Sequence, residues 1–154
     1  MPSEIKFETV TKVEMSFPNQ QAFSINAATC RDVRYKSTAF KDWHLRTKAA
    51  VQMHGKYKNL IAFAETFKQI THVAIGVTLD IYYPDWFFYN AKGVISSKTL
   101  DVTNFEKIWV DLIFDLLAIN DKHIVSLKST KSPAKEYRVE MSLEIVPTGA
   151  QEWR

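Results

Sequence analysis

Acidic residues and a lysine gather in and around one amphipathic segment of this 154-residue chain. Apolar residues at 103–118 recur at the three- and four-residue spacing of a helix, so this segment is predicted to be helical. Lys107 and Asp111 lie on one stripe of that helix, Asp101 precedes it and Asp121 follows it. Carboxylate oxygens are ligands that Mg²⁺ prefers, and a nearby lysine stabilises negative charge on a phosphate. The pattern therefore admits metal-assisted phosphate chemistry.

The same spacing also admits a purely structural interpretation. Thr103 and Glu106 have the spacing of a capping box, in which the threonine hydroxyl accepts from the Glu106 amide and Glu106 reaches back. Asp101 would then favour the positive end of the helix, and Asp111 would pair with Lys107 on its surface. Carboxylates from the two flanks of a helix converge only if the neighbouring strands fold back, so the spacing leaves both interpretations open.

Charge is distributed unevenly along the chain, whose net charge is +3. Residues 31–58 hold eight basic and two acidic residues, and residues 122–138 hold five basic and one acidic. Residues 98–115, between them, hold two basic and four acidic residues. Lysine and arginine bind the phosphodiester backbone, whereas a carboxylate centre can hold the ion that activates water, so this order suits a metal-dependent nuclease. The alternative is that these blocks are solvated helix faces. The candidate DNA-binding residues are Arg31, Arg34, Lys36, Lys41, Arg46, Lys48, Lys128 and Lys131.

Rare residue types exclude several other kinds of site. Cys30 is the only cysteine, which excludes an intramolecular disulfide, a zinc ribbon and a CxxC redox pair. The four glycines lie too far apart for a GxGxxG motif or a P-loop, so no nucleotide cofactor is expected. No apolar run approaches about 18 residues and the start does not read as a signal peptide, so we expect no membrane association and a cytoplasmic location.

Hydrophobic periodicity predicts the remaining elements. Alternating segments predict strands at 5–17, 73–83, 122–128 and 137–145, with a turn at Ser132-Pro133 before the last one. Helical spacing predicts a helix from about residue 38 toward His54, then a second helix or a continuation of the first through Phe67, with Gly55 ending or interrupting it. Residues 85–100 predict a hairpin or an ordered loop whose aromatic residues pack. These patterns indicate an α+β fold, with a mostly antiparallel sheet and helices packed on one face, in one domain over residues 1–154.

Four pieces of the sequence resemble the motif of the RusA-like Holliday junction resolvases. They are DVTNFEK at 101–107, DLI at 111–113, NDKHIV at 120–125 and Lys128. They follow the order of that family's D-x-D-N-x-x-K, D-A-L, D-D-x-x-[IV] and lysine. The likeness is densest over residues 98–131.

The resemblance implies a small homodimeric α+β endonuclease, typically encoded by a phage or prophage, that works in the cytoplasm of a bacterial host. Such enzymes bind four-way DNA junctions and nick opposed strands with Mg²⁺. By position, Asp101 and Asp121 match metal-binding aspartates and Lys107 matches the essential lysine. We therefore predict Asp101, Lys107 and Asp121 as catalytic residues, and Asp101, Asp121 and Asp111 as metal ligands.

Two positions depart from the family's pattern. Thr103 and Asn120 stand where the family commonly has aspartates, so each removes a carboxylate. Asp111 or Asp80 would compensate, and threonine and asparagine can still offer neutral oxygen ligands. The alternatives are a junction-binding protein with weakened cutting and a protein-interaction module.

Overall fold

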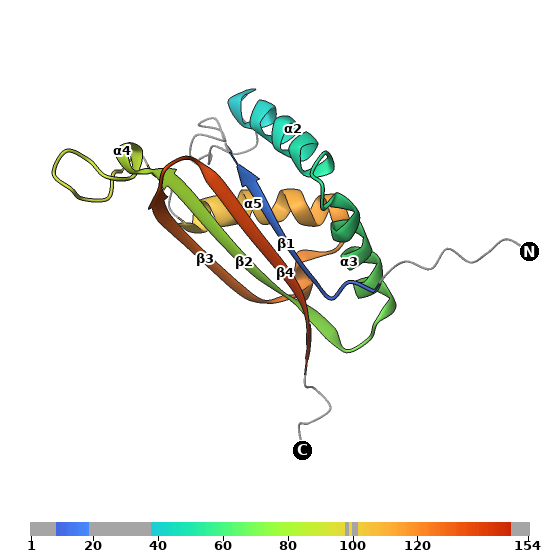
Figure 1. The fold of residues 1–154 in the computed structure, drawn as a ribbon. Coiled ribbons are helices and arrows are strands. Elements are labelled where there is room, and N and C mark those ends of the chain that lie inside the picture. The colour runs from blue at the N-terminus through green and yellow to red at the C-terminus, as the bar shows by residue number, and fades with distance from the viewer. Residues whose placement is uncertain (1–8, 19–37, 98, 100–101, 149–154) are drawn as a thin grey trace, which may run out of the picture.

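The computed structural model describes residues 9–18, 38–97, 99 and 102–148. Four strands form one sheet, and α2, α3 and α5 lie on one face of it (Figure 1). The predicted α+β class, with helices on one face of the sheet, is confirmed. The elements are β1 (Lys12–Pro18), α2 (Thr38–Gln52), α3 (Tyr57–Gln69), β2 (Val73–Pro84), α4 (Asp85–Phe88), α5 (Val102–Leu117), the 3₁₀ helix η1 (Asp121–His123), β3 (Ile124–Ala134) and β4 (Arg138–Pro147).

The sheet has the strand order β1-β4-β2-β3 and is mostly antiparallel, as predicted. β4 pairs antiparallel with both β1 and β2, whereas β2 and β3 are parallel. A parallel pair needs a long crossover, and the chain makes it through α4 and α5. This topology places β3 at one edge of the sheet and brings α5 beside it.

The predicted turn at Ser132-Pro133 is wrong. Both residues belong to β3, where Ser132 pairs with Tyr82 and Pro133 with Tyr83. Proline donates no hydrogen bond, but an edge strand has one side without a partner, so proline is tolerated there. At its other end β3 begins later than predicted, because η1 takes residues 121–123.

Three other predicted boundaries are resolved by the structure. The first strand begins at Lys12 rather than at Ile5, and residues 1–8 lie outside the described part of the chain. Gly55 lies between α2 and α3, so it separates two helices. Residues 85–97 form the short helix α4 followed by a narrow hairpin, in which Tyr89 bridges Ile95.

The core lies between the helices and the sheet, with Trp109 of α5 at its centre. Its ring stacks on Phe105 at 5.8 Å and meets Phe17 of β1 edge-on at 5.3 Å. The indole N–H donates to Met141 Sδ of β4 at 3.3 Å. Because Trp109 contacts both β1 and β4, it fixes α5 against these two neighbouring strands of the sheet.

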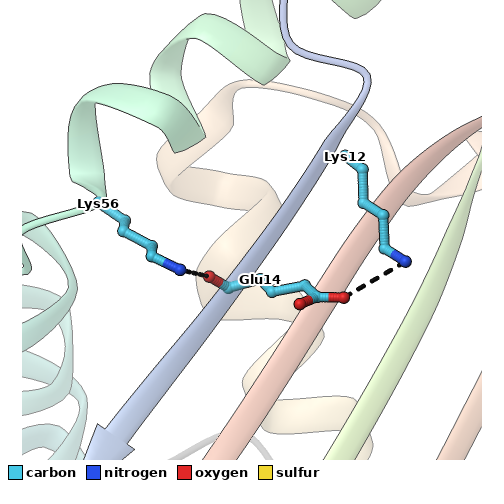
Figure 2. Close-up of polar contacts among 3 residues, drawn as sticks. All are labelled: Lys12, Glu14 and Lys56. Carbon is cyan, nitrogen blue, oxygen red and sulfur yellow. Dashed lines mark hydrogen bonds and ion pairs between the residues drawn. The ribbon is translucent and has the colours of Figure 1, made fainter.

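The opposite face of the sheet is polar. Glu14 on β1 carries an ion pair with Lys12 at 3.3 Å, and its backbone oxygen accepts from the Lys56 amine at 3.1 Å (Figure 2). Lys56 belongs to the link between α2 and α3, so this contact ties that link to β1. Among the described residues, no helix is long and apolar enough to cross a membrane.

Candidate functional site

The polar stripe of α5 is exposed as the sequence predicts. Lys107 and Asp111 are exposed on the helix surface, whereas Ile108 and Leu112 beside them are buried. No described residue forms an ion pair with the Lys107 amine. The lysine charge is thus available to an anion from outside the chain.

A tight reversal at the end of α5 brings Asp121 back toward this stripe. Ala118 adopts a φ of 55°. The backbone N–H of Ala118 donates to the backbone oxygen of Asp115 at 3.2 Å, and that of Ile119 donates to the backbone oxygen of Phe114 at 3.1 Å. This is the hydrogen-bond pattern of a Schellman motif, which ends a helix and turns the chain. The amide oxygen of Asn120 then accepts from Lys122 N at 2.9 Å and caps η1, whose first residue is Asp121.

Lys107, Asp111 and Asp121 line one groove between α5 and β3. The groove has a volume of ≈ 440 Å³, and its remaining wall includes Glu106 of α5 and the apolar residues at the start of β3. The strand following α5 therefore folds back as the metal-site interpretation requires. Two residues of α5 and one that follows the helix thus meet on one concave surface.

Asp111 and Asp121 also line a second hollow, which opens toward α2. This hollow has a volume of ≈ 670 Å³, and its wall includes Asp115, Asn120 and His44 of α2. The two hollows share Asp111 and Asp121, so these carboxylates lie where the groove from β3 meets the hollow under α2. That shared position holds two carboxylates.

Glu106 does not form the predicted capping box. α5 begins at Val102, so Thr103 lies inside the helix, and the Glu106 carboxylate accepts a hydrogen bond from the Ser129 hydroxyl of β3. Glu106 thus links α5 to the edge strand across the groove. The capping-box interpretation is wrong because a partner on a distant strand takes the glutamate.

Comparison with known proteins identifies the family of the chain. A family model for the endodeoxyribonuclease RusA matches residues 20–144 of the chain. The chain belongs to the RusA endodeoxyribonuclease family. It is therefore a nuclease of the Holliday junction resolvase type whose partner is DNA, and the interaction-module alternative loses its basis.

The other two comparisons add no function. No curated protein matches the chain. Among solved structures, a 2C-methyl-D-erythritol-2,4-cyclodiphosphate synthase in its CDP-bound form aligns with a TM-score of 0.34 and 10% identity, over 88% of this chain and 97% of that one. A likeness at that level indicates neither a shared fold nor a shared activity.

The metal ligands predicted for this RusA-family protein are only partly described. Asp101 lies outside the described residues, so the structure gives no distance from it to Asp121. Among the residues described, no three His, Cys, Asp or Glu side chains converge closely enough to hold a metal ion. Asp111 and Asp121 are exposed carboxylates in one groove, a donor type that fits a hard divalent cation.

Asp80 does not join this group. It alternates with buried Leu79 and Ile81 on β2, so it faces the polar side of the sheet, where Thr130 donates to its carboxylate. It lines a separate hollow with Glu14 and Glu140. Of the two acids expected to compensate for the missing carboxylates, only Asp111 lies in the groove with Asp121.

Of the predicted DNA-binding residues, those that the structure describes lie on two elements, α2 and β3. Arg31, Arg34 and Lys36 lie outside the described residues. Lys41 and Lys48 lie three residues before and four after His44 on α2, so helical spacing places both on the face of α2 that carries His44.

The other three basic residues have different surroundings. Arg46 pairs with Asp42 at 2.9 Å, and Lys128 is exposed on β3. Lys131 is half-buried and donates to Thr99 at 3.1 Å. A count of charges cannot distinguish an exposed lysine from one that is engaged inside the fold.

Sequence analysis missed His44 and Ser129. His44 lines the larger hollow beside the carboxylates, and Ser129 holds Glu106 across the groove. Neither residue belongs to a motif, and each reaches the site only through tertiary packing. No local signal in the sequence marks them.

Proposed function

We propose that this protein resolves four-way DNA junctions as a Mg²⁺-dependent endonuclease, with Asp101, Lys107 and Asp121 as its catalytic residues. The observation that supports the proposal most strongly is the groove between α5 and β3, which Lys107, Asp111 and Asp121 line together. The exposed Lys107 charge and the paired carboxylates are the two features that phosphodiester cleavage needs.

Asp121 and Asp111, together with Asp101, would hold the cation. A bound Mg²⁺ supplies a water molecule of lowered pKa as the nucleophile and neutralises charge on the phosphate. Asp111 and Asp121 are exposed, so ligand positions beyond them are open to water, which suits an ion that keeps several waters. Asp121 is held in place by the reversal at Ala118 and by the Asn120 cap.

Lys107 would donate to a non-bridging phosphate oxygen and stabilise the negative charge that grows as the water attacks. It lies on the same helix as Asp111, one turn earlier, so a phosphate seated in the groove would lie beside both the lysine and the carboxylates that would hold the cation. Phosphate contacts from Lys41 and Lys48 on α2 would orient the DNA arms without reading sequence.

We further propose that the chain is one endonuclease domain that acts as a homodimer in a bacterial cytoplasm and is encoded by a phage or prophage. One groove cuts one strand, so symmetric resolution needs two copies, and a two-fold dimer matches the symmetry of a junction. The single core around Trp109 supports the single domain. The origin and location rest on membership of the family.

The test is cleavage of a synthetic four-way junction with Mg²⁺ or with EDTA. Asp121→Asn is expected to lower the cleavage rate by at least about a hundredfold, because it removes a charged ligand where transition-state charge is stabilised. Asp115→Asn is the matched control, since Asp115 is an exposed aspartate of α5 that lines only the larger hollow. Equal cleavage by wild type and Asp121→Asn would refute the proposed site.

A second candidate, a junction-binding protein with weakened cutting, is favoured by one contact. The Asn120 oxygen that would serve as a neutral ligand already accepts from Lys122 N. This candidate predicts tight, salt-sensitive junction binding with no product at any Mg²⁺ concentration. The same assay therefore separates the two functions.

A further inference from the structure

Residues 85–97, here called the aromatic arm, project beyond the end of the sheet (Figure 1). α4 begins the arm and the Tyr89–Ile95 bridge closes it. Its backbone is well bonded, since Ser96 N donates to Phe88 O at 2.7 Å and Asn90 N donates to Val94 O at 2.8 Å. The arm is therefore an ordered projection rather than a loose loop.

Aromatic packing fixes the base of the arm to the sheet. Phe88 is buried, and Phe87 stacks on Tyr83 of β2 at 5.6 Å with an interplanar angle of 19°. Tyr137, just before β4, meets Phe87 edge-on at 5.7 Å, and burial raises the pKa of its hydroxyl. These rings confirm the expectation that aromatic residues of this segment pack.

Trp86 is the exception to that packing. Its side chain is 76% exposed, although the adjacent Phe87 holds it edge-on at 5.9 Å. Tyr89, Val94 and Ile95 of the same arm are also exposed. An exposed apolar group of this kind on an ordered scaffold is typical of a surface that contacts a partner.

The arm also encloses a hollow of ≈ 320 Å³. It is lined by Trp86, Phe87, Tyr89, Asn90, Ala91 and Ser96. Asn90 Oδ1 accepts from Lys92 N at 2.9 Å and from Val94 N at 3.1 Å, which fixes the plane of the amide. No described residue accepts from its Nδ2, so that nitrogen can donate to a ligand. Aromatic faces together with a fixed donor match the flat rings and edge acceptors of a nucleobase.

We propose that the hollow of the aromatic arm binds one unstacked nucleobase of branched DNA, with the base stacked on Trp86 or Tyr89 and hydrogen-bonded by Asn90. This inference rests on the proposed function. At a branch point base stacking is interrupted, so a base there is cheaper to extrude than one inside a duplex.

Position favours DNA over a second protein chain as the occupant. The arm leads into α5, and Thr99 after the arm receives a hydrogen bond from Lys131 of β3. DNA in the groove along α5 would therefore pass the arm at the end where that helix begins (Figure 1). The exposed charged residues nearby are of both signs, namely Lys92, Lys135, Asp85 and Glu136. It is thus the position of the arm and the chemistry of its hollow, not charge, that favour DNA.

The experiment compares two synthetic four-way junctions, measured by fluorescence anisotropy in EDTA so that nothing is cleaved. One carries a single unpaired adenine at the branch point, and the other carries an abasic site there. The proteins are wild type, Trp86→Ala and Met53→Ala, the last being a matched control because Met53 is an apolar side chain 85% exposed outside the arm. Trp86 is exposed, so its removal is expected to leave the fold intact.

Wild type and Met53→Ala are expected to bind the adenine junction between about fivefold and a hundredfold more tightly than the abasic one, the range of one base–aromatic stack. Trp86→Ala is expected to bind both junctions equally. Asn90→Asp, which keeps the oxygen for both backbone amides but loses the donor, is expected to lower the adenine preference in part.

Two results would overturn the proposal that the hollow binds a base, while leaving the proposed function intact. One is an adenine preference that is absent in wild type or unchanged in Trp86→Ala. The other is a shift in the sedimentation of the free protein on Trp86→Ala, which would assign the arm to a second copy of the chain. A wild type that binds four-way junctions no better than duplex DNA, and that cleaves neither, would overturn the proposed function as well.

Discussion

Asn120 and Asp121 are adjacent in the sequence but have different structural roles. The Asn120 side chain caps η1 through Lys122 N, whereas Asp121 is exposed on the wall of both hollows. An amide oxygen that already accepts a backbone hydrogen bond is a poor ligand for a cation. At the scale of single residues, asparagine at position 120, where the family commonly has an aspartate, therefore keeps the cap of η1 but removes a negative charge.

Asn120→Asp is expected to restore that charge without disturbing the turn. Asparagine and aspartate cap about equally well, so stability should change by less than about 0.5 kcal/mol. One carboxylate oxygen would keep the bond to Lys122 N, and the added charge beside Asp121 would bind a cation better by about fivefold or more, on the order of 1 kcal/mol. A titration of junction cleavage against Mg²⁺ measures this, and an unchanged midpoint would contradict it.

At the scale of elements, hydrophobic periodicity predicted the helices and strands whose formation depends on burying one face. The periodicity of α5 and β2 follows from burial of one face, and both were predicted nearly to their ends. The same alternation would have placed Asp80 on the polar face, opposite to Leu79, and so away from the groove. The pairing of β3 with β2 and the hydrogen bond from Ser129 to Glu106 join residues that are distant in the sequence. No spacing within the sequence could reveal them.

The element that delivers Asp121 to the groove carries a testable strain. Ala118 ends α5 at a φ of 55°, a conformation that costs most residues roughly 1–2 kcal/mol. Ala118→Gly is expected to stabilise the fold by about 1 kcal/mol, because its side chain is exposed and little packing is lost. Urea unfolding measures the gain. Ala49→Gly, at an exposed site inside α2, should shift stability by a similar amount in the opposite direction, and a loss of stability in both variants would refute the argument.

At the scale of the whole molecule, the acidic concavity is framed by separate structures. α2 borders one hollow, β3 borders the other, and the aromatic arm projects at the end where α5 begins (Figure 1). Each chain brings one set of these features, and a four-way junction presents opposed strands that are related by a two-fold axis. The cleavage outcome should therefore depend on how many intact grooves the assembly contains.

A heterodimer of wild type and Asp121→Asn tests that dependence. Purified through two different affinity tags, it is expected to cut one strand of a four-way junction, leaving a nicked product that stays branched on a native gel. In the proposed homodimer, the wild type is expected to release linear duplexes by paired nicks, because each of its two intact grooves would cut one of two opposed strands. Denaturing gels would count the cut strands in each case. If the heterodimer releases duplexes as fast as wild type, then one groove can serve both strands, and the two-groove arrangement is wrong.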